Sequence, residues 1–215
     1  MKYDVNITEK SLILKVSKDF FSGFDTTDDT SNIDFMVADS NAGGLKKEYY
    51  FWAEAKRGIK ADIYASIVQL ILTIGKAEMK SRTLLPPHYF GALDVEKIAF
   101  LPNHQIMSVF SQNDFNWNVT PSNHDTKEFK QIYEMTQDIL ATESLIFYWD
   151  KNEEELREFI AKNFVRGNTS TRKIQITKNN FKNVYYDWLE IVKPTISVNW
   201  EEEKPEILDT DFYIA

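Results

Sequence analysis

One short segment, Glu54-Ala55-Lys56, has residue types and spacing suited to metal-dependent hydrolysis. Residues two apart on a strand point to the same face, so Glu54 and Lys56 are expected to share one. The segment ends an aromatic and apolar run, where a charge is costly unless it is paired or binds a metal. A second acid, Asp34, opens the preceding apolar run. Two adjacent strands could therefore place Asp34, Glu54 and Lys56 around one metal ion, which suits phosphodiester hydrolysis.

The tripeptide alone is not specific, because Glu-x-Lys also begins at Glu78, Glu128 and Glu202. The first two of these copies lie in polar, helical surroundings and the third in a run of acids. Only Glu54 ends a strand-like stretch that follows an acid-led hairpin. Asp39 is a rival for the first acid, but it lies at the turn end of its strand. The alternative interpretation of the pattern is a salt bridge on an edge strand.

The elements that must position these residues follow from apolar periodicity, capping residues and turn signals. The helix over 61–80 is apolar around most of its circumference, which is typical of a helix in the middle of a domain. Its polar exception, Gln69, is either a satisfied core residue or part of the site. An aromatic-rich loop at 113–121 is expected to plug a hydrophobic core. The predicted elements are helices at 8–21, 61–80, 126–141, 152–163 and 180–192, and strands at 33–39, 48–56, 95–101, 145–149 and 172–177.

Composition limits the class of protein. The 215 residues, 43% hydrophobic and 14% aromatic, fit one large domain or one domain with a helical appendage. The chain has no cysteine, which excludes disulfides and thiolate metal sites and predicts a reducing compartment. No run approaches the roughly 18 apolar residues of a membrane span, and the N-terminus lacks a signal-peptide core. We therefore expect a soluble, cytoplasmic protein without a membrane partner.

The net charge of −8 is unusual for a protein that binds nucleic acid, because a duplex binder normally presents a basic face. The charge is unevenly distributed, however. One basic cluster spans 56–60, beside the candidate site, and a second spans 166–182. The second cluster is either a solvated face or a phosphate-contacting one.

The order of the elements resembles the PD-(D/E)xK nuclease superfamily over residues 8–101: helix, strand with Asp34, hairpin, strand with Glu54-x-Lys56, helix with Gln69, strand. The resemblance implies an α/β fold with a restriction-endonuclease-like mixed sheet flanked by helices. Beyond this core we expect a helical C-terminal extension, which divides the chain into residues 1–110 and 111–215.

The resemblance also assigns roles to individual residues. Asp34 and Glu54, with the carbonyl of Ala55, would bind Mg²⁺ or Mn²⁺, ions that prefer carboxylate, carbonyl and water ligands. Lys56 and Gln69 would complete the catalytic set. Some branches of the superfamily add an acid from the first helix, which here would be Glu9.

Three departures from the family pattern stand in the sequence. Ile33 replaces a proline before the first acid, and Thr73 replaces a tyrosine four residues after Gln69. The family core also has a strand between the first helix and the strand with the acid, but residues 22–32 do not resemble one. This last departure puts the place of Glu9 in question.

The wider pattern is similar to N-terminal nuclease domains of bacterial restriction-modification enzymes, in which a DNA methyltransferase follows in the same polypeptide. The resemblance implies a metal-dependent DNA endonuclease domain whose full-length protein adds methyltransferase and target-recognition domains. No methyltransferase motif occurs here, so this chain would be only the cleavage half of such a fusion. The largely apolar end at 207–215 also leads us to expect a fragment of a longer protein. Cutting both strands would require a homodimer on DNA. The alternatives are a catalytically silent nuclease-like module that binds DNA or a protein, and a metal-independent interaction domain.

Overall fold

The computed structural model describes residues 2–27, 32–40, 47–78, 86–112 and 114–165, together with positions 181 and 185. Its contacts divide the chain into two units, Met1–Gln175 and Ile176–Ala215. The helices and strands named below all belong to the first unit. The strand predicted at 172–177 and, apart from positions 181 and 185, the helix predicted at 180–192 lie outside the described residues.

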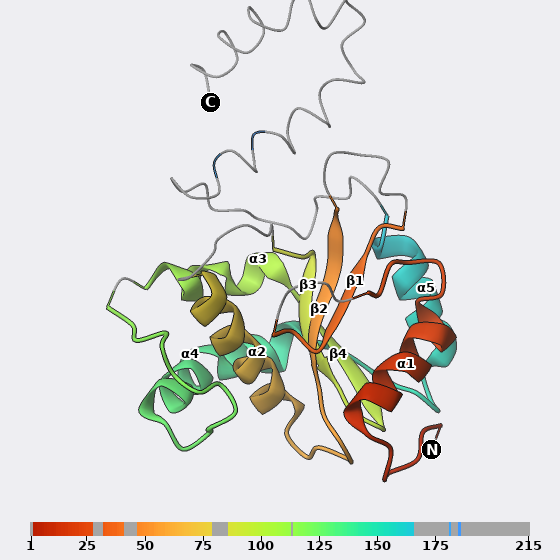
Figure 1. Ribbon diagram of the computed structural model, residues 1–215, viewed down its shortest axis with the longest axis horizontal. Coiled ribbons are helices and arrows are strands. Elements are labelled where there is room, and N and C mark those ends of the chain that lie inside the picture. The colour runs from red at the N-terminus through yellow and green to blue at the C-terminus, as the bar shows by residue number, and fades with distance from the viewer. Residues whose placement is uncertain are drawn as a thin grey trace, which may run out of the picture. The chain divides into compact units, whose positions relative to one another are not determined.

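A five-stranded mixed sheet forms the centre of the first unit (Figure 1). Its strands follow one another in chain order, β1-β2-β3-β4-β5, and only the β2–β3 pair is parallel. A parallel pair needs a crossover connection, which α2 supplies. The strands are β1 (Phe35–Ala38), β2 (Tyr49–Ala55), β3 (Tyr89–Leu93), β4 (Lys97–Pro102) and β5 (Leu145–Tyr148).

Helices cover both faces of this sheet, so the predicted α/β architecture with a flanked mixed sheet is confirmed. Helices α1 and α5 lie on one face, and α2, α3 and α4 lie on the other (Figure 1). Each face has its own hydrophobic core. The helical elements are α1 (Glu9–Phe20), α2 (Ile63–Glu78), α3 (Asn103–Ile106), the short 3-10 helix η1 (Met107–Ser111), α4 (Lys127–Glu143) and α5 (Glu153–Asn163).

Local capping explains where the helices begin. The hydroxyl of Thr8 accepts the backbone N–H of Ser11 at the start of α1, as the sequence predicts. Asp62 accepts the backbone N–H groups of Tyr64 and Ala65 at 3.0 and 3.3 Å, and so caps α2. The apolar circumference of α2 is buried between the sheet and α4, which confirms its central position.

Strand β3 is absent from the sequence prediction, which places the strand over 95–101 directly after the central helix. That segment is β4; β3 precedes it and pairs with β2. The prediction failed because β3 is short and carries Gly91 in its middle, which favours a turn. The glycine is required: a Cβ there would collide with the Ala99 carbonyl and the Phe51 ring.

The region beyond residue 110 also contributes to the sheet. Strand β5 pairs with β4, and α5 packs against the core on the α1 face. The loop predicted to plug a core does so through Trp117, which is 5% exposed. No helix among those described here is both long and apolar enough to cross a lipid bilayer.

Candidate active site

The two predicted acids lie beside each other at one end of the β1–β2 pair. Phe35 pairs with Ala53 in the antiparallel register, which sets the preceding Asp34 next to Glu54. Asp34 accepts the backbone N–H of Ala55 through Oδ2 at 3.0 Å. This hydrogen bond fixes the Asp34 carboxylate against the end of β2.

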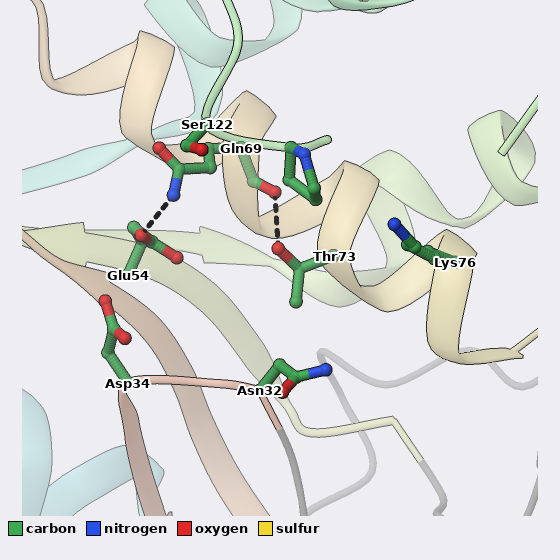
Figure 2. A pocket seen from close by; sticks show the side chains of 8 residues that line it. Asn32, Asp34, Glu54, Gln69, Thr73, Lys76 and Ser122 are labelled. Atoms are coloured by element: carbon green, nitrogen blue, oxygen red, sulfur yellow. Dashed lines mark hydrogen bonds between the residues drawn. The ribbon is translucent and has the colours of Figure 1, made fainter. Parts of the chain in front are cut away.

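Glu54 is 4% exposed and points to the face of the sheet that α2 covers (Figure 2). Two donors contact the same oxygen of its carboxylate. Nζ of Lys56 lies 2.6 Å from Oε1, and Nε2 of Gln69 donates to Oε1 at 2.5 Å. The structure therefore brings together all four side chains that the sequence singles out: Asp34, Glu54, Lys56 and Gln69.

The surroundings of Glu54 disfavour the charged form of its carboxylate. Its pKa is raised from 4.5 to about 7. Burial is the largest cause; the ion pair with Lys56 lowers the pKa, and the charge and a hydrogen bond of Asp34 raise it. A bound cation would relieve both the desolvation and the repulsion between the carboxylates.

The donor set fits a hard divalent ion. Two carboxylates converge, and the chain passes directly from Glu54 to the carbonyl of Ala55. Mg²⁺ is usually held by one or two carboxylates and keeps several waters, so this set is sufficient. Among the described residues, no three His, Asp or Glu side chains gather to hold a metal by themselves. An ion here would take its other ligands from a carbonyl and water.

Glu9 lies near the site without joining the acid pair. Its Oε1 accepts the backbone N–H of Arg57 at 3.2 Å. Glu9 therefore tethers α1 to the chain just after Lys56. The Asp39 carboxylate, the rival acid, lies at the far end of β1, as expected from its position.

A cavity of about 270 Å³ opens at the acid pair and runs along α2 (Figure 2). Its walls come from the segment before β1, from β2, from α2 and from the 114–126 loop. The lining residues are Asn32, Asp34, Glu54, Gln69, Thr73, Lys76, Pro121 and Ser122.

His124, in the 114–126 loop, belongs to the site but was missed by the sequence analysis. Its Nε2 lies 3.5 Å from Oε1 of Gln69, and its ring stacks on Phe129 with centroids 4.1 Å apart. Burial, followed by the positive charge of Lys56, lowers the pKa of His124. The neutral ring can donate to Gln69 and hold its amide toward Glu54. No local sequence pattern predicts that a loop residue so far along the chain from Gln69 contacts it.

The 114–126 loop is held against α2 by a close contact. A Cβ on Gly75 would collide with the indole of Trp117, so only glycine lets that ring lie against the helix. Lys76 donates to the carbonyl of Val119 at 2.7 Å. These two contacts fix the part of the loop that reaches the cavity.

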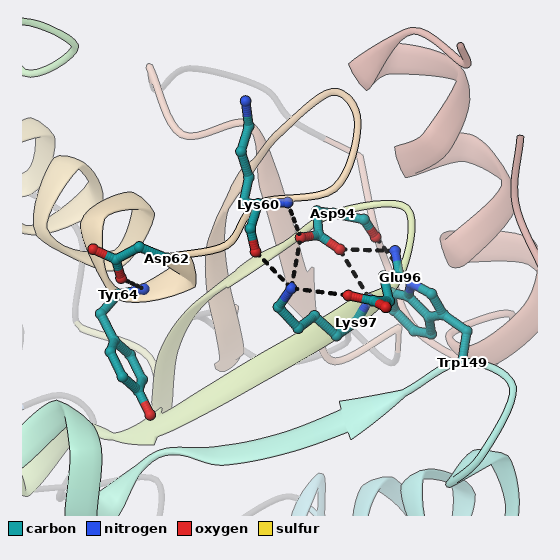
Figure 3. Close-up of polar contacts among 7 residues, drawn as sticks. All are labelled: Lys60, Asp62, Tyr64, Asp94, Glu96, Lys97 and Trp149. Carbon is teal, nitrogen blue, oxygen red and sulfur yellow. Dashed lines mark hydrogen bonds and ion pairs between the residues drawn. The ribbon is translucent and has the colours of Figure 1, made fainter. Parts of the chain in front are cut away.

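The segment after Lys56 is fixed by a buried ion pair on the β3–β4 turn (Figure 3). Asp94 accepts the backbone N–H of Lys60 at 2.9 Å, and Nζ of Lys97 donates to the carbonyl of Lys60 at 2.7 Å. Nζ of Lys97 also lies 3.2 Å from Oδ2 of Asp94. Trp149 donates through Nε1 to the carbonyl of Asp94 at 2.9 Å.

This network explains the charge state of Lys97 and the place of the basic cluster. Burial alone would lower the pKa of Lys97, but Asp94 and Glu96 raise it above its usual value. The charged pair therefore clamps the backbone of Lys60. These contacts fix the backbone at Lys60, between Lys56 and the start of α2.

Comparison with known proteins adds no family assignment: no family model, curated protein or solved structure matches this chain.

Proposed function

We propose that this chain is a metal-dependent DNA endonuclease domain that hydrolyses phosphodiester bonds. The observation that carries the proposal is the meeting of two carboxylates, Asp34 and Glu54, which line one cavity, with the ammonium of Lys56 paired to Glu54. Burial and the neighbouring Asp34 raise the pKa of Glu54 to about 7 although Lys56 is paired with it. A bound cation would offset the remaining cost, which supports a metal site here.

Each residue then has a defined task. Asp34 and Glu54 would hold Mg²⁺ or Mn²⁺, with the carbonyl of Ala55 as a further ligand. When bound, such an ion polarises a phosphoryl oxygen and acidifies a water. Lys56 would offset charge on the phosphate as it is attacked. Gln69 keeps the Glu54 carboxylate aligned through its hydrogen bond.

The partners follow from the same proposal. The substrate is DNA, and the restriction-modification resemblance adds methyltransferase and target-recognition domains in a full-length polypeptide, a homodimer on DNA and a cytoplasmic location. The catalytically silent module is the second candidate, because Lys56 is already paired with Glu54 in this conformation.

Plasmid nicking in Mg²⁺ or Mn²⁺ tests the proposal. The native chain should nick supercoiled plasmid, and a chelator should stop it. Lys56→Met should lower the rate by about 10²-fold or more, the usual cost of removing a group that stabilises transition-state charge. Lys130→Met is the matched control, since Lys130 ends another Glu-x-Lys copy outside the site.

The outcomes separate the two candidates. Equal loss in both lysine variants would remove the special role of Lys56. Metal binding is measured by calorimetry. If binding depends on Glu54 but the native chain does not nick the plasmid, the silent module is favoured. If the native chain neither binds the metal nor nicks the plasmid, the proposal is refuted.

A further inference from the structure

The cavity has two ends of opposite charge. One end carries the carboxylates of Asp34 and Glu54. The other carries the ammonium of Lys76, and the amide of Asn32 and the hydroxyl of Ser122 also line the cavity. A metal ion would complement the carboxylates at the acidic end only. At the other end, the positive charge of Lys76 would complement a negatively charged ligand.

The spacing of α2 sets the distance between these ends. Gln69, Thr73 and Lys76 line the cavity from one face of the helix, at intervals of four and three residues. Lys76 lies seven positions after Gln69, which corresponds to an advance of about 10 Å along the helix. Figure 2 shows Gln69 over Glu54 and Lys76 farther along the same helix. The separation of these backbone positions favours one phosphate at each end over a single phosphate that contacts both.

Lys76 has donors to give to a ligand. An ammonium carries three N–H groups. Within the described part of the chain, its hydrogen bond goes to the carbonyl of Val119, so two N–H groups remain. Asn32 and Ser122 can donate as well. Ammonium, amide and hydroxyl groups all suit phosphate oxygens.

We propose that the Lys76 end of the cavity binds a second phosphate of the same nucleic-acid strand, beside the one held at the Asp34–Glu54 end. This inference rests on the proposed function and extends it: the strand lies along α2, and Lys76 sets its register. The competing account is purely structural, with Lys76 serving only to tie the 114–126 loop through Val119.

The salt dependence of DNA binding separates these accounts. Binding of a fluorescent duplex is measured with Ca²⁺ at several salt concentrations for the native chain, Lys76→Met, Lys76→Arg, Gly75→Ala and Lys15→Met. Lys15 is exposed on α1, on the opposite face of the sheet, and controls for net charge. Gly75→Ala disturbs the loop through Trp117 without changing any charge. Melting curves establish that each variant is folded.

If Lys76 contacts a phosphate, Lys76→Met should weaken binding about tenfold. The negative slope of log K against log salt should become shallower by about 0.9. Lys76→Arg and Lys15→Met should keep the native slope, and Gly75→Ala should weaken binding at an unchanged slope. A native slope in Lys76→Met would overturn the inference and leave the nuclease proposal standing. A native chain that neither binds nor nicks DNA would overturn both.

Discussion

Glu54→Gln should stabilise the metal-free protein at pH 8 and change its stability little at pH 5. Glutamine has the shape of protonated glutamate and can accept from the same two donors, Lys56 and Gln69. The pKa of Glu54 is about 7 in the folded chain and near 4.5 when unfolded. Between these values the folded state binds more protons, so the stability of the native chain falls as the pH rises.

The size of the effect follows from the same two pKa values. Moving the pKa from 4.5 to about 7, at about 1.4 kcal/mol for each pH unit, gives on the order of 3 kcal/mol. The native chain carries this penalty in full above pH 7 and loses it as the pH falls toward 4.5. The variant carries none of it. The gain from Glu54→Gln should therefore grow from pH 5 to pH 8 and then level off.

Urea unfolding of both chains at pH 5, 6, 7 and 8, with a chelator present, measures this gain. Titrating groups that do not interact with Glu54 cancel in the difference between the two chains. A difference that does not vary with pH, or a variant less stable than the native chain at pH 8, would refute the reasoning. Adding Mn²⁺ at about 100 times its Kd should stabilise the native chain alone, by about 2.7 kcal/mol.

Two further predictions concern the frame around the site. Gly91→Ala should lower stability by about 1–3 kcal/mol or more, because its methyl group would meet the Ala99 carbonyl. Thermal melting beside Gly23→Ala checks this, since a Cβ at Gly23 has nothing within 4 Å; equal melting of the two would contradict it. Asp94→Ala should cost about 3–5 kcal/mol in urea unfolding, because it leaves the buried Lys97 ammonium without its partner. A loss below 1 kcal/mol would show that Glu96 compensates.

The acidic half of the site could be predicted from the sequence because local rules determine it. The two-residue period of a strand puts Glu54 and Lys56 on one face, and an acid at the start of the neighbouring strand meets them once the hairpin forms. Gln69 was harder, since a lone polar residue in an apolar helix is compatible with a core. Its contact with Glu54 depends on where α2 docks.

The rest of the site could not be predicted because it depends on contacts between distant segments. Ser122 lines the cavity and His124 contacts Gln69 because the 114–126 loop is held against α2. The contacts that hold it, Trp117 with Gly75 and Lys76 with Val119, are not predicted by any periodicity. Strand β3 was missed for a related reason. Gly91 reads locally as a turn signal, and only its packing against β4 shows why a strand needs a glycine there.

The strand register also predicts an order in which the site assembles during folding. Phe35 pairs with Ala53 across the hairpin, whereas Ala53 pairs with Gly91 about twice as far along the chain. Closing the longer loop costs more entropy, so the hairpin is favoured to form first. The two carboxylates would then meet before Gln69 and the 114–126 loop arrive. Repulsion would act in the folding transition state, and stopped-flow refolding without metal should be faster at pH 5 than at pH 8, with Glu54→Gln losing that difference.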